Sequence, residues 1–270
     1  MSKLFSVKDK VVVITGGCGI LGSDMVQYLA SEGAKLVVLD RNKERGDELI
    51  DRVKSNGGEA LFLETDVLNK EILEQNKTEI LAAYGTIDVL INAAGGNMPG
   101  ATIAPDKTIF DLNMGDFEKV VDLNLYGTVL PTLVFGKVMA EKKEGSIVNI
   151  SSESALRPLT RVVGYGTAKA AVTNFTKYLA AEMAIKFGSG IRVNAMAPGF
   201  FLTEQNRTLL TNPDGTYTDR ARTIIAHTPA GRFGEAEELL GTLQWLISDA
   251  SKFVTGTVTV IDGGFDAFSI

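Results

Sequence analysis

Apolar residues occur along this chain in short, nearly continuous runs. Seven such runs are rich in valine, isoleucine and leucine, at residues 11–14, 36–39, 60–63, 89–91, 147–150, 191–194 and 258–261. Continuous apolar runs of this length suit strands that are buried on both faces, as the strands of a parallel sheet are. The pattern therefore predicts seven buried strands.

Longer segments with helical periodicity separate these runs, at residues 24–31, 44–55, 70–84, 117–141, 165–187 and 235–248. The repeated order of strand and helix predicts an α/β fold, a doubly wound parallel sheet with helices on both faces. No proline-, glycine- or serine-rich linker and no internal repeat divides the chain, so we expect a single domain over residues 1–270. Two irregular stretches, about residues 95–115 and 200–232, are expected to form substrate-binding loops.

Composition and charge narrow the classes of partner. The chain has 27 Lys or Arg and 33 Asp or Glu among 270 residues, and its net charge of −6 argues against nucleic acid or an anionic membrane as the main partner. With one cysteine, Cys18, and one histidine, His227, it has no internal disulfide, and we expect no metal. The first ten residues are interrupted by charges and do not form a signal-peptide core. We therefore expect a cytoplasmic protein that acts on a small molecule.

Glycines follow the first predicted strand in the order Gly16-x-x-Gly19-x-x-Gly22, directly before the first predicted helix. Glycine at such positions permits a tight turn and a close approach of the backbone to a pyrophosphate, which the first N–H groups of the helix would face. A turn with only a structural role is the alternative. We expect the cofactor to contact the backbone of Gly16, Gly19, Ile20, Leu21 and Gly22.

Asp40 ends the second predicted strand, 18 residues after Gly22. An acidic side chain about 20 residues after the glycine loop accepts hydrogen bonds from the ribose hydroxyls in dinucleotide sites, although Asp40 could also be an ordinary turn residue. Its charge would repel a 2′-phosphate, so NAD is expected as the cofactor. Arg41 keeps NADP open, because its guanidinium could turn toward that phosphate.

Tyr165 and Lys169 lie four residues apart and would share one face of a predicted helix. A nearby ammonium favours the phenolate and lowers the pKa of a tyrosine toward the working pH, as proton transfer requires. Such a pair also arises by chance, so its meaning depends on the other motifs of the chain.

With these features, the sequence resembles the short-chain dehydrogenase/reductase family over nearly its whole length. Further matches follow the predicted strands in order: Asp66-Val67, Asn92-Ala93-Ala94-Gly95, Asn124, Ser151-Ser152, Asn194, Pro198-Gly199 with Thr203, and Asp262-Gly263-Gly264. The chain departs from the family where Ile20 replaces the middle glycine of the loop and Gly19 precedes it. That spacing is similar to the one in longer sugar-nucleotide epimerases and dehydratases, but the additional substrate domain of about 80 residues in those proteins has no counterpart here.

This resemblance implies a Rossmann-type sheet of seven strands, a nicotinamide cofactor and four catalytic residues. Ser152, 13 residues before Tyr165, would hydrogen-bond the reacting oxygen, and Tyr165 would transfer the proton. Lys169 would lower the tyrosine pKa and bind the nicotinamide ribose, and Asn124 would hold a water in a proton relay. The other implied cofactor contacts are Asp66 and Val67 to the adenine, Asn92, Ala93 and Ala94 as support, and Pro198, Gly199 and Thr203 near the carboxamide.

The resemblance also implies a homotetramer or homodimer, built on the helices that carry Asn124 and Tyr165.

Candidate substrate contacts lie close to Ser152, which would itself touch the substrate. Arg157 and Arg161 precede Tyr165, and a guanidinium suits bidentate binding of a carboxylate. Pairing of these arginines with Glu153 or another surface acid is the alternative. Asn97, by analogy with the family, lies at the mouth of the same cleft.

Residues 95–99, 110–112, 123–131 and 262–269 are similar to the branch of D-mannonate oxidoreductases, also called fructuronate reductases. A hexuronate substrate would account for a carboxylate clamp. The expected reaction is therefore an NAD-linked interconversion of a secondary alcohol and a ketone on a sugar acid, specifically D-fructuronate and D-mannonate. A general sugar-alcohol or 3-oxoacyl reductase is the alternative. A nucleotide-sensing protein without catalysis is disfavoured by the complete catalytic set.

Overall fold

The computed structural model describes residues 3–202 and 210–269. Strands and longer helices follow one another in the order β1 (Val11–Thr15), α1 (Ile20–Ser31), β2 (Lys35–Asp40), α2 (Lys43–Ser55), β3 (Glu59–Glu64), α3 (Lys70–Tyr84), β4 (Val89–Asn92), α4 (Met114–Val121), α5 (Gly127–Lys142), β5 (Gly145–Ile150), α6 (Val163–Phe187), β6 (Ile191–Pro198), α8 (Asp219–Ala226), α9 (Leu240–Ile247) and β7 (Val258–Ile261). Short 3-10 turns lie at Lys3–Phe5, Pro99–Ala101, Ile109–Asp111, Glu153–Ala155, Ala236–Leu239 and Asp249–Ser251. The seven expected strands are all present, and β6 continues beyond its expected end.

The strands form one parallel sheet in the order β3-β2-β1-β4-β5-β6-β7. This arrangement confirms the expected Rossmann-type, doubly wound fold. Because all strands run in the same direction, their carboxyl ends meet at one edge. The strand order reverses between β1 and β4, and connections leave such a point on opposite faces, which opens a crevice at the carboxyl edge.

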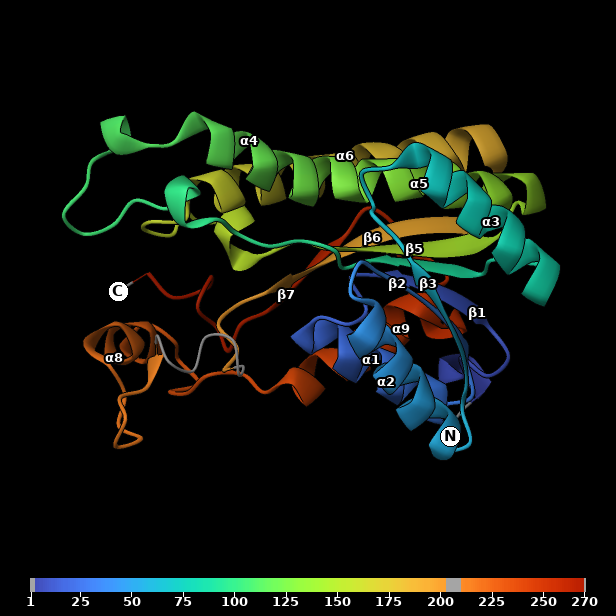
Figure 1. Ribbon diagram of the computed structural model, residues 1–270, viewed down its shortest axis with the longest axis horizontal. Helices are drawn as coiled ribbons and strands as arrows, with labels where there is room; N and C mark the ends of the chain where they lie inside the picture. Colours follow the sequence, from blue (N-terminus) through green and yellow to red (C-terminus); the bar gives the residue numbers. More distant parts are fainter. Residues whose placement is uncertain (1–2, 203–209, 270) are drawn as a thin grey trace.

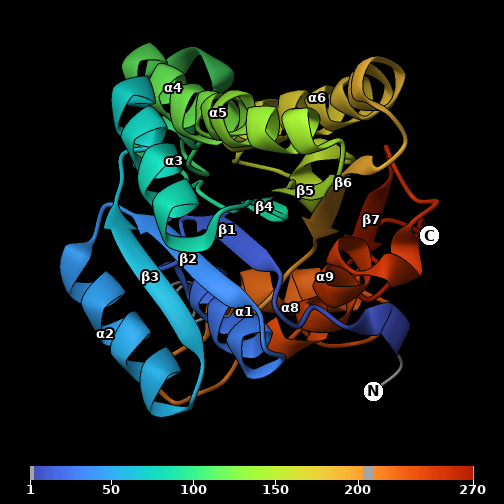
Figure 2. The ribbon, with the colours of Figure 1, turned by 90° about the vertical axis from the view of Figure 1, so that its right-hand side faces the viewer.

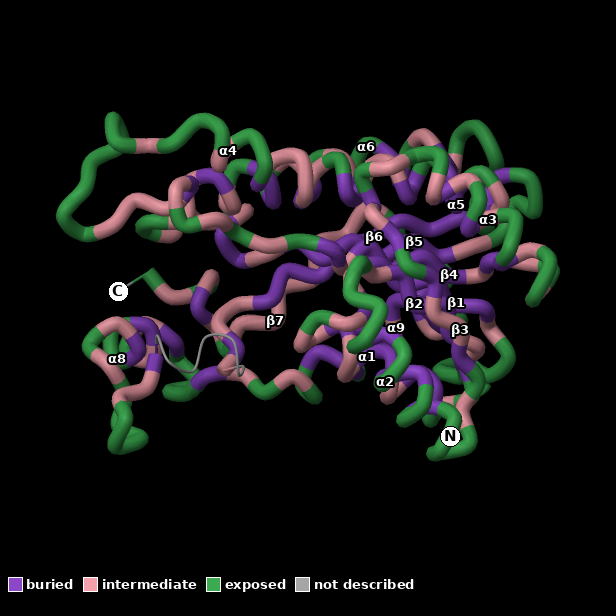
Figure 3. The backbone as a smooth tube through the Cα atoms, in the orientation of Figure 1, coloured by how far each residue is buried: buried purple, intermediate pink, exposed green. Residues whose placement is uncertain are grey.

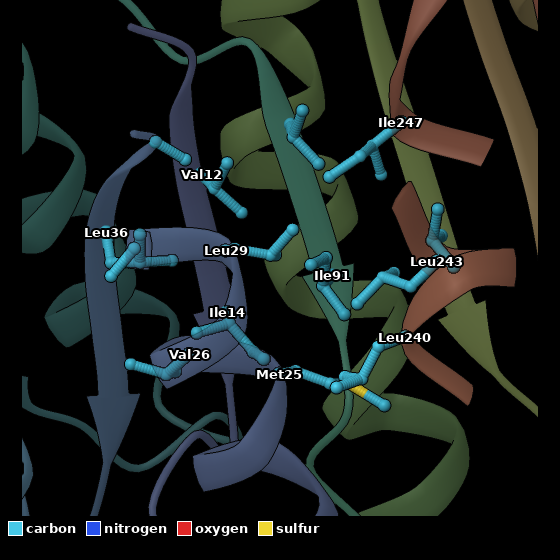
Figure 4. Packing of buried hydrophobic residues seen from close by; sticks show 14 of the residues in the cluster. Val12, Ile14, Met25, Val26, Leu29, Leu36, Ile91, Leu240, Leu243 and Ile247 are labelled. Atoms are coloured by element: carbon cyan, nitrogen blue, oxygen red, sulfur yellow. The ribbon is translucent and has the colours of Figure 1, made fainter. Parts of the chain in front are cut away.

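Helices cover both faces of the sheet (Figures 1 and 2). One apolar cluster lies between the sheet and α1, α2 and α9, and a second lies between the sheet and α3, α5 and α6. Figure 4 shows part of the first cluster, with side chains Val12, Ile14, Met25, Val26, Leu29, Leu36, Ile91, Leu240, Leu243 and Ile247 in contact across the layers. Full burial of one such side chain contributes about 1.5–3 kcal/mol. Figure 3 shows this burial concentrated in the strands and on the inner sides of the helices.

Three elements differ from the prediction. The expected helix 117–141 consists of α4 and α5 joined by a π turn at Asp122–Tyr126, in which one extra residue enters the helix. The expected helix 235–248 begins as a 3-10 turn before α9. The stretch 200–232, expected to be irregular, contains α8, which Thr218 caps by accepting a hydrogen bond from Ala221 N. α8 has only eight residues and buries only Ala221 and Ile224, too few for a clear periodicity.

One helical stretch in the described residues, Met114–Lys142, is long and apolar enough by composition to cross a membrane. In its most apolar window, 56% of the residues are buried within the protein. The core helix of a soluble protein has the same property, so this stretch is weak evidence for a membrane span.

The C-terminal segment, residues 262–268, is held against the turn that follows β5. Arg157 pairs with Asp266, with 2.9 Å between Nε and Oδ1. Glu153 in the same turn is 1% exposed, and neither carboxyl oxygen has a hydrogen-bond partner in the described part of the chain. Burial, and then the carboxylates of Asp266 and Asp262, raise the pKa of Glu153 to about 7, against the opposing charge of Arg157. Glu153 is therefore largely protonated in the folded protein below this pH.

Replacing Glu153 with Gln should change how stability depends on pH. Glutamine resembles the protonated carboxyl group, so the free energies of unfolding should be most similar near pH 5. As the pH rises, the unfolded wild type loses the Glu153 proton while the folded protein keeps it up to about pH 7, so the wild type should lose about 1–3 kcal/mol relative to the variant. Urea denaturation from about pH 5 to pH 8 measures this difference. Glu141→Gln, at an exposed position on α5, is the control, and parallel profiles for wild type and Glu153→Gln would refute the assignment.

Candidate active site

A cavity of about 370 Å³ lies at the carboxyl edge of the sheet, where β1, β4, β5 and β6 end. Its walls come from four separate parts of the chain: the glycine loop and the start of α1, the turn after β4, Ser151 and Ser152 after β5 together with Tyr165 and Lys169 of α6, and Pro198 to Phe201 after β6. The structure therefore brings the predicted glycine loop and three of the four predicted catalytic residues into one cavity.

The glycine loop places the start of α1 against this cavity. Gly16 has a φ of 65°, and a Cβ atom at Gly22 would lie 2.4 Å from the carbonyl oxygen of Gly16, so side chains are excluded at both positions. No side chain caps the helix at Gly19. The N–H groups of Ile20, Leu21 and Gly22 make no hydrogen bond in the described structure, and all three residues line the cavity. Free N–H groups at a helix N-terminus fit the pyrophosphate of a dinucleotide.

A second cavity, of about 220 Å³, adjoins the first on the side of β2 and is lined by Gly16, Gly19, Leu39, Asp40, Arg41, Thr65, Val67, Ala93, Ala94, Gly95 and Leu123. Asp40 Oδ2 accepts a hydrogen bond from Cys18 N, and Oδ1 accepts one from Asn42 N, both at 3.0 Å. Each carboxylate oxygen retains capacity for a further donor such as a ribose hydroxyl. The site therefore fits the adenosine half of a dinucleotide.

Two adjacent serines after β5 have different surroundings. Ser151 is buried, and its hydroxyl lies 2.6 Å from Thr173 Oγ1. Ser152 Oγ accepts hydrogen bonds from Ser154 N at 3.2 Å and Ser154 Oγ at 3.0 Å, and its side chain also hydrogen-bonds Tyr165. Ser152 therefore has the geometry to act together with Tyr165, as the sequence spacing predicts.

Lys169 is a buried cation beside Tyr165. Its side chain is 3% exposed, its Nζ donates to Ile150 O at 2.7 Å, and Nζ lies 5.5 Å from the centre of the Tyr165 ring. Burial lowers the pKa of Lys169 to about 8. Burial also raises the pKa of Tyr165, and the hydrogen bond from Ser152 opposes that rise. The pKa of Tyr165 is therefore raised rather than lowered as expected from Lys169, because burial of the phenol disfavours its charged form.

Asn124 lies in the π turn and is fully buried. Its Nδ2 donates to Gly96 O at 2.7 Å and to Val120 O at 2.8 Å, while Gly96 N donates to Oδ1 at 3.3 Å. A Cβ atom at Gly95 would come within 2.6 Å of Asn124 Oδ1 and 3.2 Å of Lys169 Nζ. Asn124 thus joins the π turn to the loop after β4, next to Lys169.

Other predicted residues lie beside the two cavities rather than in their walls. Asn92 is buried, and its Nδ2 donates to Thr132 Oγ1 at 2.9 Å and Asn149 Oδ1 at 2.8 Å, linking β4 to its neighbours. Asp66 accepts from Leu68 N within its own turn, although its neighbours Thr65 and Val67 face the cavity. Asn97 is exposed and bonded to Thr102 and Met98. Thr203 lies outside the described residues.

The two predicted substrate arginines differ in their environments. Arg157 is held by the C-terminal segment, through Asp266 and through Phe268 O at 3.3 Å. This matches the alternative of pairing with an acid, although the acid is Asp266 rather than Glu153. Arg161 is exposed, has a φ of 77°, and accepts a backbone hydrogen bond from Ile103 N at 2.8 Å.

Several cavity residues were not predicted. Met25 of α1, Phe200 and Phe201 complete the walls of the larger cavity. The two phenylalanines directly follow the predicted Pro198-Gly199 pair, so their place in the sequence could have identified them as cavity residues. Met25 has no comparable signal, because a methionine on an apolar helix face is indistinguishable from a core residue.

A cavity of similar size, about 360 Å³, lies at the opposite edge of the sheet and is lined by several basic residues. Lys142 pairs with Asp88, and Lys252 Nζ lies 3.0 Å from Asp249 Oδ2. The buried Arg192 donates to the backbone oxygens of Leu246 and Ser248 and to Ser251 Oγ. Because these cations are neutralised or hydrogen-bonded within the protein, the carboxyl edge is the better candidate for an active site.

Comparison with known proteins agrees with this geometry. The family model described as enoyl-(acyl carrier protein) reductase matches residues 19–266. An uncharacterized oxidoreductase of Bacillus subtilis (strain 168), UxuB, is 44% identical over 273 residues, which cover 98% of this chain and 97% of that protein.

Two solved structures are similar over nearly the whole chain. The crystal structure of a candidate D-mannonate oxidoreductase from Haemophilus influenza, with bound NAD, has 42% identity and a TM-score of 0.92, covering 98% of this chain and 97% of that one. A gluconate 5-dehydrogenase from Burkholderia cenocepacia J2315, in complex with NADP and tartrate, has 30% identity and a TM-score of 0.85, covering 99% of both chains. From these matches and the shared fold, the chain belongs to the short-chain dehydrogenase/reductase family of NAD(P)-dependent oxidoreductases.

Proposed function

We propose that this protein interconverts a secondary alcohol and a ketone on a sugar acid, with D-fructuronate and D-mannonate as the substrate pair and NAD as the cofactor. The observation that carries the proposal is the single cavity in which Ser152, Tyr165 and Lys169 lie beside the free N-terminus of α1. Such a cavity holds a proton donor and a dinucleotide side by side, as a carbonyl reductase requires.

Separate residues of the chain would orient the reacting oxygen, transfer the proton and adjust the pKa of the proton donor. Ser152 hydrogen-bonds the reacting oxygen and orients it toward Tyr165, which gives its phenolic proton to the oxygen in reduction and recovers it in oxidation. Lys169 is mostly protonated below its pKa of about 8, and its charge favours the phenolate form of Tyr165. Asn124 joins the π turn to the loop after β4 beside Lys169. It would also hold a water for the proton relay. When bound, the nicotinamide would supply the hydride in reduction and accept it in oxidation.

The cofactor would be held by residues on both sides of the glycine loop. The N–H groups of Ile20, Leu21 and Gly22 would bind the pyrophosphate, Asp40 would accept hydrogen bonds from the adenosine ribose, and Lys169 would bind the nicotinamide ribose. Val67, Ala93 and Ala94 pack on the adenine side, whereas Pro198 and Gly199 lie near the carboxamide. The charge of Asp40 favours NAD, although Arg41 in the same wall leaves NADP possible as a weaker cofactor.

A sugar acid is supported by the solved relative described as a candidate D-mannonate oxidoreductase with bound NAD. The relative that holds tartrate, a hydroxy acid, gives further support. The described parts of the loops 95–115 and 200–232 would contribute contacts to this substrate. A 3-oxoacyl reductase is the second candidate, because the matching family model is described as an acyl-carrier-protein reductase.

We also propose that the protein acts in the cytoplasm as a homotetramer or homodimer. Its helical layer carries several exposed large apolar side chains, Tyr126 in the π turn, Leu133 on α5, and Tyr178 and Ile185 on α6. Such side chains on neighbouring helices favour a subunit interface there.

Purified protein should oxidise NADH when D-fructuronate is added, and it should act poorly on a neutral ketose. Loss of absorbance of the reduced cofactor measures the reaction, with tagaturonate, D-fructose and an acyl-thioester ketone as comparison substrates. Turnover of the acyl-thioester ketone alone would replace this proposal with the 3-oxoacyl alternative.

Tyr165→Phe should lower kcat/KM by about 10²- to 10⁴-fold, because the reacting oxygen loses its proton donor. Binding of NADH should change little, since the substitution removes one hydroxyl. Steady-state kinetics and a fluorescence titration of NADH measure the two effects. Tyr84→Phe, at the last residue of α3 and outside both cavities, is the matched control. Retention of wild-type activity by Tyr165→Phe would refute the assigned role.

Asp40→Asn should raise kcat/KM for NADPH by about 10- to 100-fold and lower it for NADH, because a negative charge beside the 2′-phosphate is removed. Asp40 accepts hydrogen bonds from Cys18 N and Asn42 N, and the single side-chain oxygen of asparagine can keep one of these two bonds with little distortion. Asp51→Asn, an exposed position on α2, should leave the ratio of the two cofactors unchanged. An unchanged ratio in Asp40→Asn would show that Asp40 does not discriminate between the cofactors.

A further inference from the structure

The C-terminal segment, residues 262–268, packs directly behind one wall of the active-site cavity. Phe265 is buried, and its ring meets the ring of Phe200 edge to face, with 5.1 Å between ring centres. Phe200 is one of the residues that line this cavity. Phe265 also contacts the ring of His227 at the end of α8, with 4.7 Å between ring centres. The position of Phe200 therefore depends on the segment that carries Phe265.

The segment forms a tight turn after β7. Asp262 Oδ1 accepts a hydrogen bond from Gly264 N at 2.8 Å, and Oδ2 accepts one from Asp266 N at 2.6 Å. Gly264 has a φ of 90°, a conformation that favours glycine. At the start of the turn, Gly199 N donates to Ile261 O at 2.9 Å, which joins the end of β7 to the end of β6. The turn is thus attached at one end to the strand that leads into the cavity wall.

Arg157 attaches the other end of the turn to the loop after β5. Its Nε donates to Asp266 Oδ1 at 2.9 Å, its Nη1 donates to Phe268 O at 3.3 Å, and its Nη2 donates to Asp266 O. The backbone N–H of Arg157 is itself hydrogen-bonded within the 3-10 turn that Ser152 caps. Ser152 and Phe200 both line the active-site cavity. Arg157 therefore connects two walls of this cavity through the C-terminal segment.

The contacts of Arg157 point away from a direct role in substrate binding. It is not among the described residues that line the two cavities at the carboxyl edge. All three nitrogens of its guanidinium group donate to the C-terminal segment, so a substrate carboxylate would have to displace Asp266. The arginine is therefore placed to act on the site through the segment that it holds.

We propose that Arg157 is a positioning residue that sets the separation of Ser152 and Phe200 across the active-site cavity, acting through Asp266 and Phe265. This inference rests on the proposed function, because the wall formed by Phe200 would contact the sugar acid. Such a role affects how well the substrate fits between the two walls. The proton donor and the glycine loop lie in other parts of the chain, so they should be affected much less.

Replacing Asp266 with Ala separates this role from a direct contact, because the two predict opposite signs. If Arg157 positions Phe200, loss of its carboxylate partner loosens the segment and raises KM for D-fructuronate by about 3- to 10-fold, with a much smaller change in kcat. If Arg157 bound the substrate carboxylate, the same substitution would free its guanidinium group and leave KM unchanged or lower. Steady-state kinetics measure both constants. Lys252→Gln, which removes an ion pair with Asp249 at the opposite edge of the sheet, is the matched control and should leave KM unchanged.

Phe265→Leu tests the path between the arginine and the cavity. Leucine keeps an apolar side chain but removes the ring that packs against Phe200, so KM should rise to a similar extent. Adding Asp266→Ala to Phe265→Leu should then raise KM by less than about twofold more, since both changes interrupt the same path. Fully multiplicative effects of the two substitutions would overturn the path through Phe265.

Hydrogen–deuterium exchange of the protein without ligands gives a readout that does not require turnover. In Asp266→Ala, the backbone amides of residues 262–268 and 199–201 should exchange about 10-fold faster, because local opening of the segment becomes easier. The amides of β1 and the glycine loop should be unchanged. Faster exchange restricted to residues 262–268 would show that the segment does not support the cavity wall, and the inference would be wrong.

These measurements separate the inference from the proposed function. Turnover of D-fructuronate by the wild type, with unchanged or lower KM in Asp266→Ala, would overturn the positioning role and leave the function standing. Absence of D-fructuronate turnover by the wild type would overturn the proposed substrate, and exchange at residues 199–201 would then decide the inference. Faster exchange there in Asp266→Ala supports the positioning role, and unchanged exchange overturns it.

Discussion

The close contact between the end of β1 and the end of β4 is the constraint on which the active site depends. A Cβ atom at Gly16 would lie 2.7 Å from Ala94 Cα, and Thr15 Oγ1 accepts hydrogen bonds from the N–H groups of Ala93 and Ala94 at 3.2 Å. Both cavities share Gly16 and Ala93 in their walls. The contact therefore sets the positions of the two cavities relative to each other, and any larger side chain at Gly16 would push the two strand ends apart.

Hydrogen bonds to main-chain oxygens hold the polar residues of the site in place. Lys169 keeps a charge in a buried position because Ile150 O accepts from it, and a buried ammonium without an acceptor would be costly. Asn124 occupies a π turn, where the extra residue shifts the helix register and directs the amide toward Gly96. In the proposed reaction, proton transfer at Tyr165 would therefore depend on groups that main-chain oxygens hold in place, rather than on surface ion pairs.

Charge is distributed unevenly around the C-terminal segment. Burial and the nearby carboxylates of Asp266 and Asp262 raise the pKa of Glu153, while the charge of Arg157 opposes that rise. Arg157 also pairs with Asp266, so the same arginine fixes the C-terminal segment against the turn that follows β5.

The sequence by itself determined the seven strands, the doubly wound sheet and the family, because these depend on local patterns. Continuous apolar runs specify buried strands, and the glycines specify the turn after β1. The spacing along the chain also places Ser152 after the end of β5, and Tyr165 and Lys169 on one face of a helix. Only the tertiary structure decided which charged side chains have an ion-pair partner. The sequence predicts the same carboxylate-binding role for Arg157 and Arg161, yet Arg157 pairs with Asp266, more than 100 residues away, whereas Arg161 is exposed. The partner of a charged side chain is set by the packing of distant segments, which local patterns do not encode.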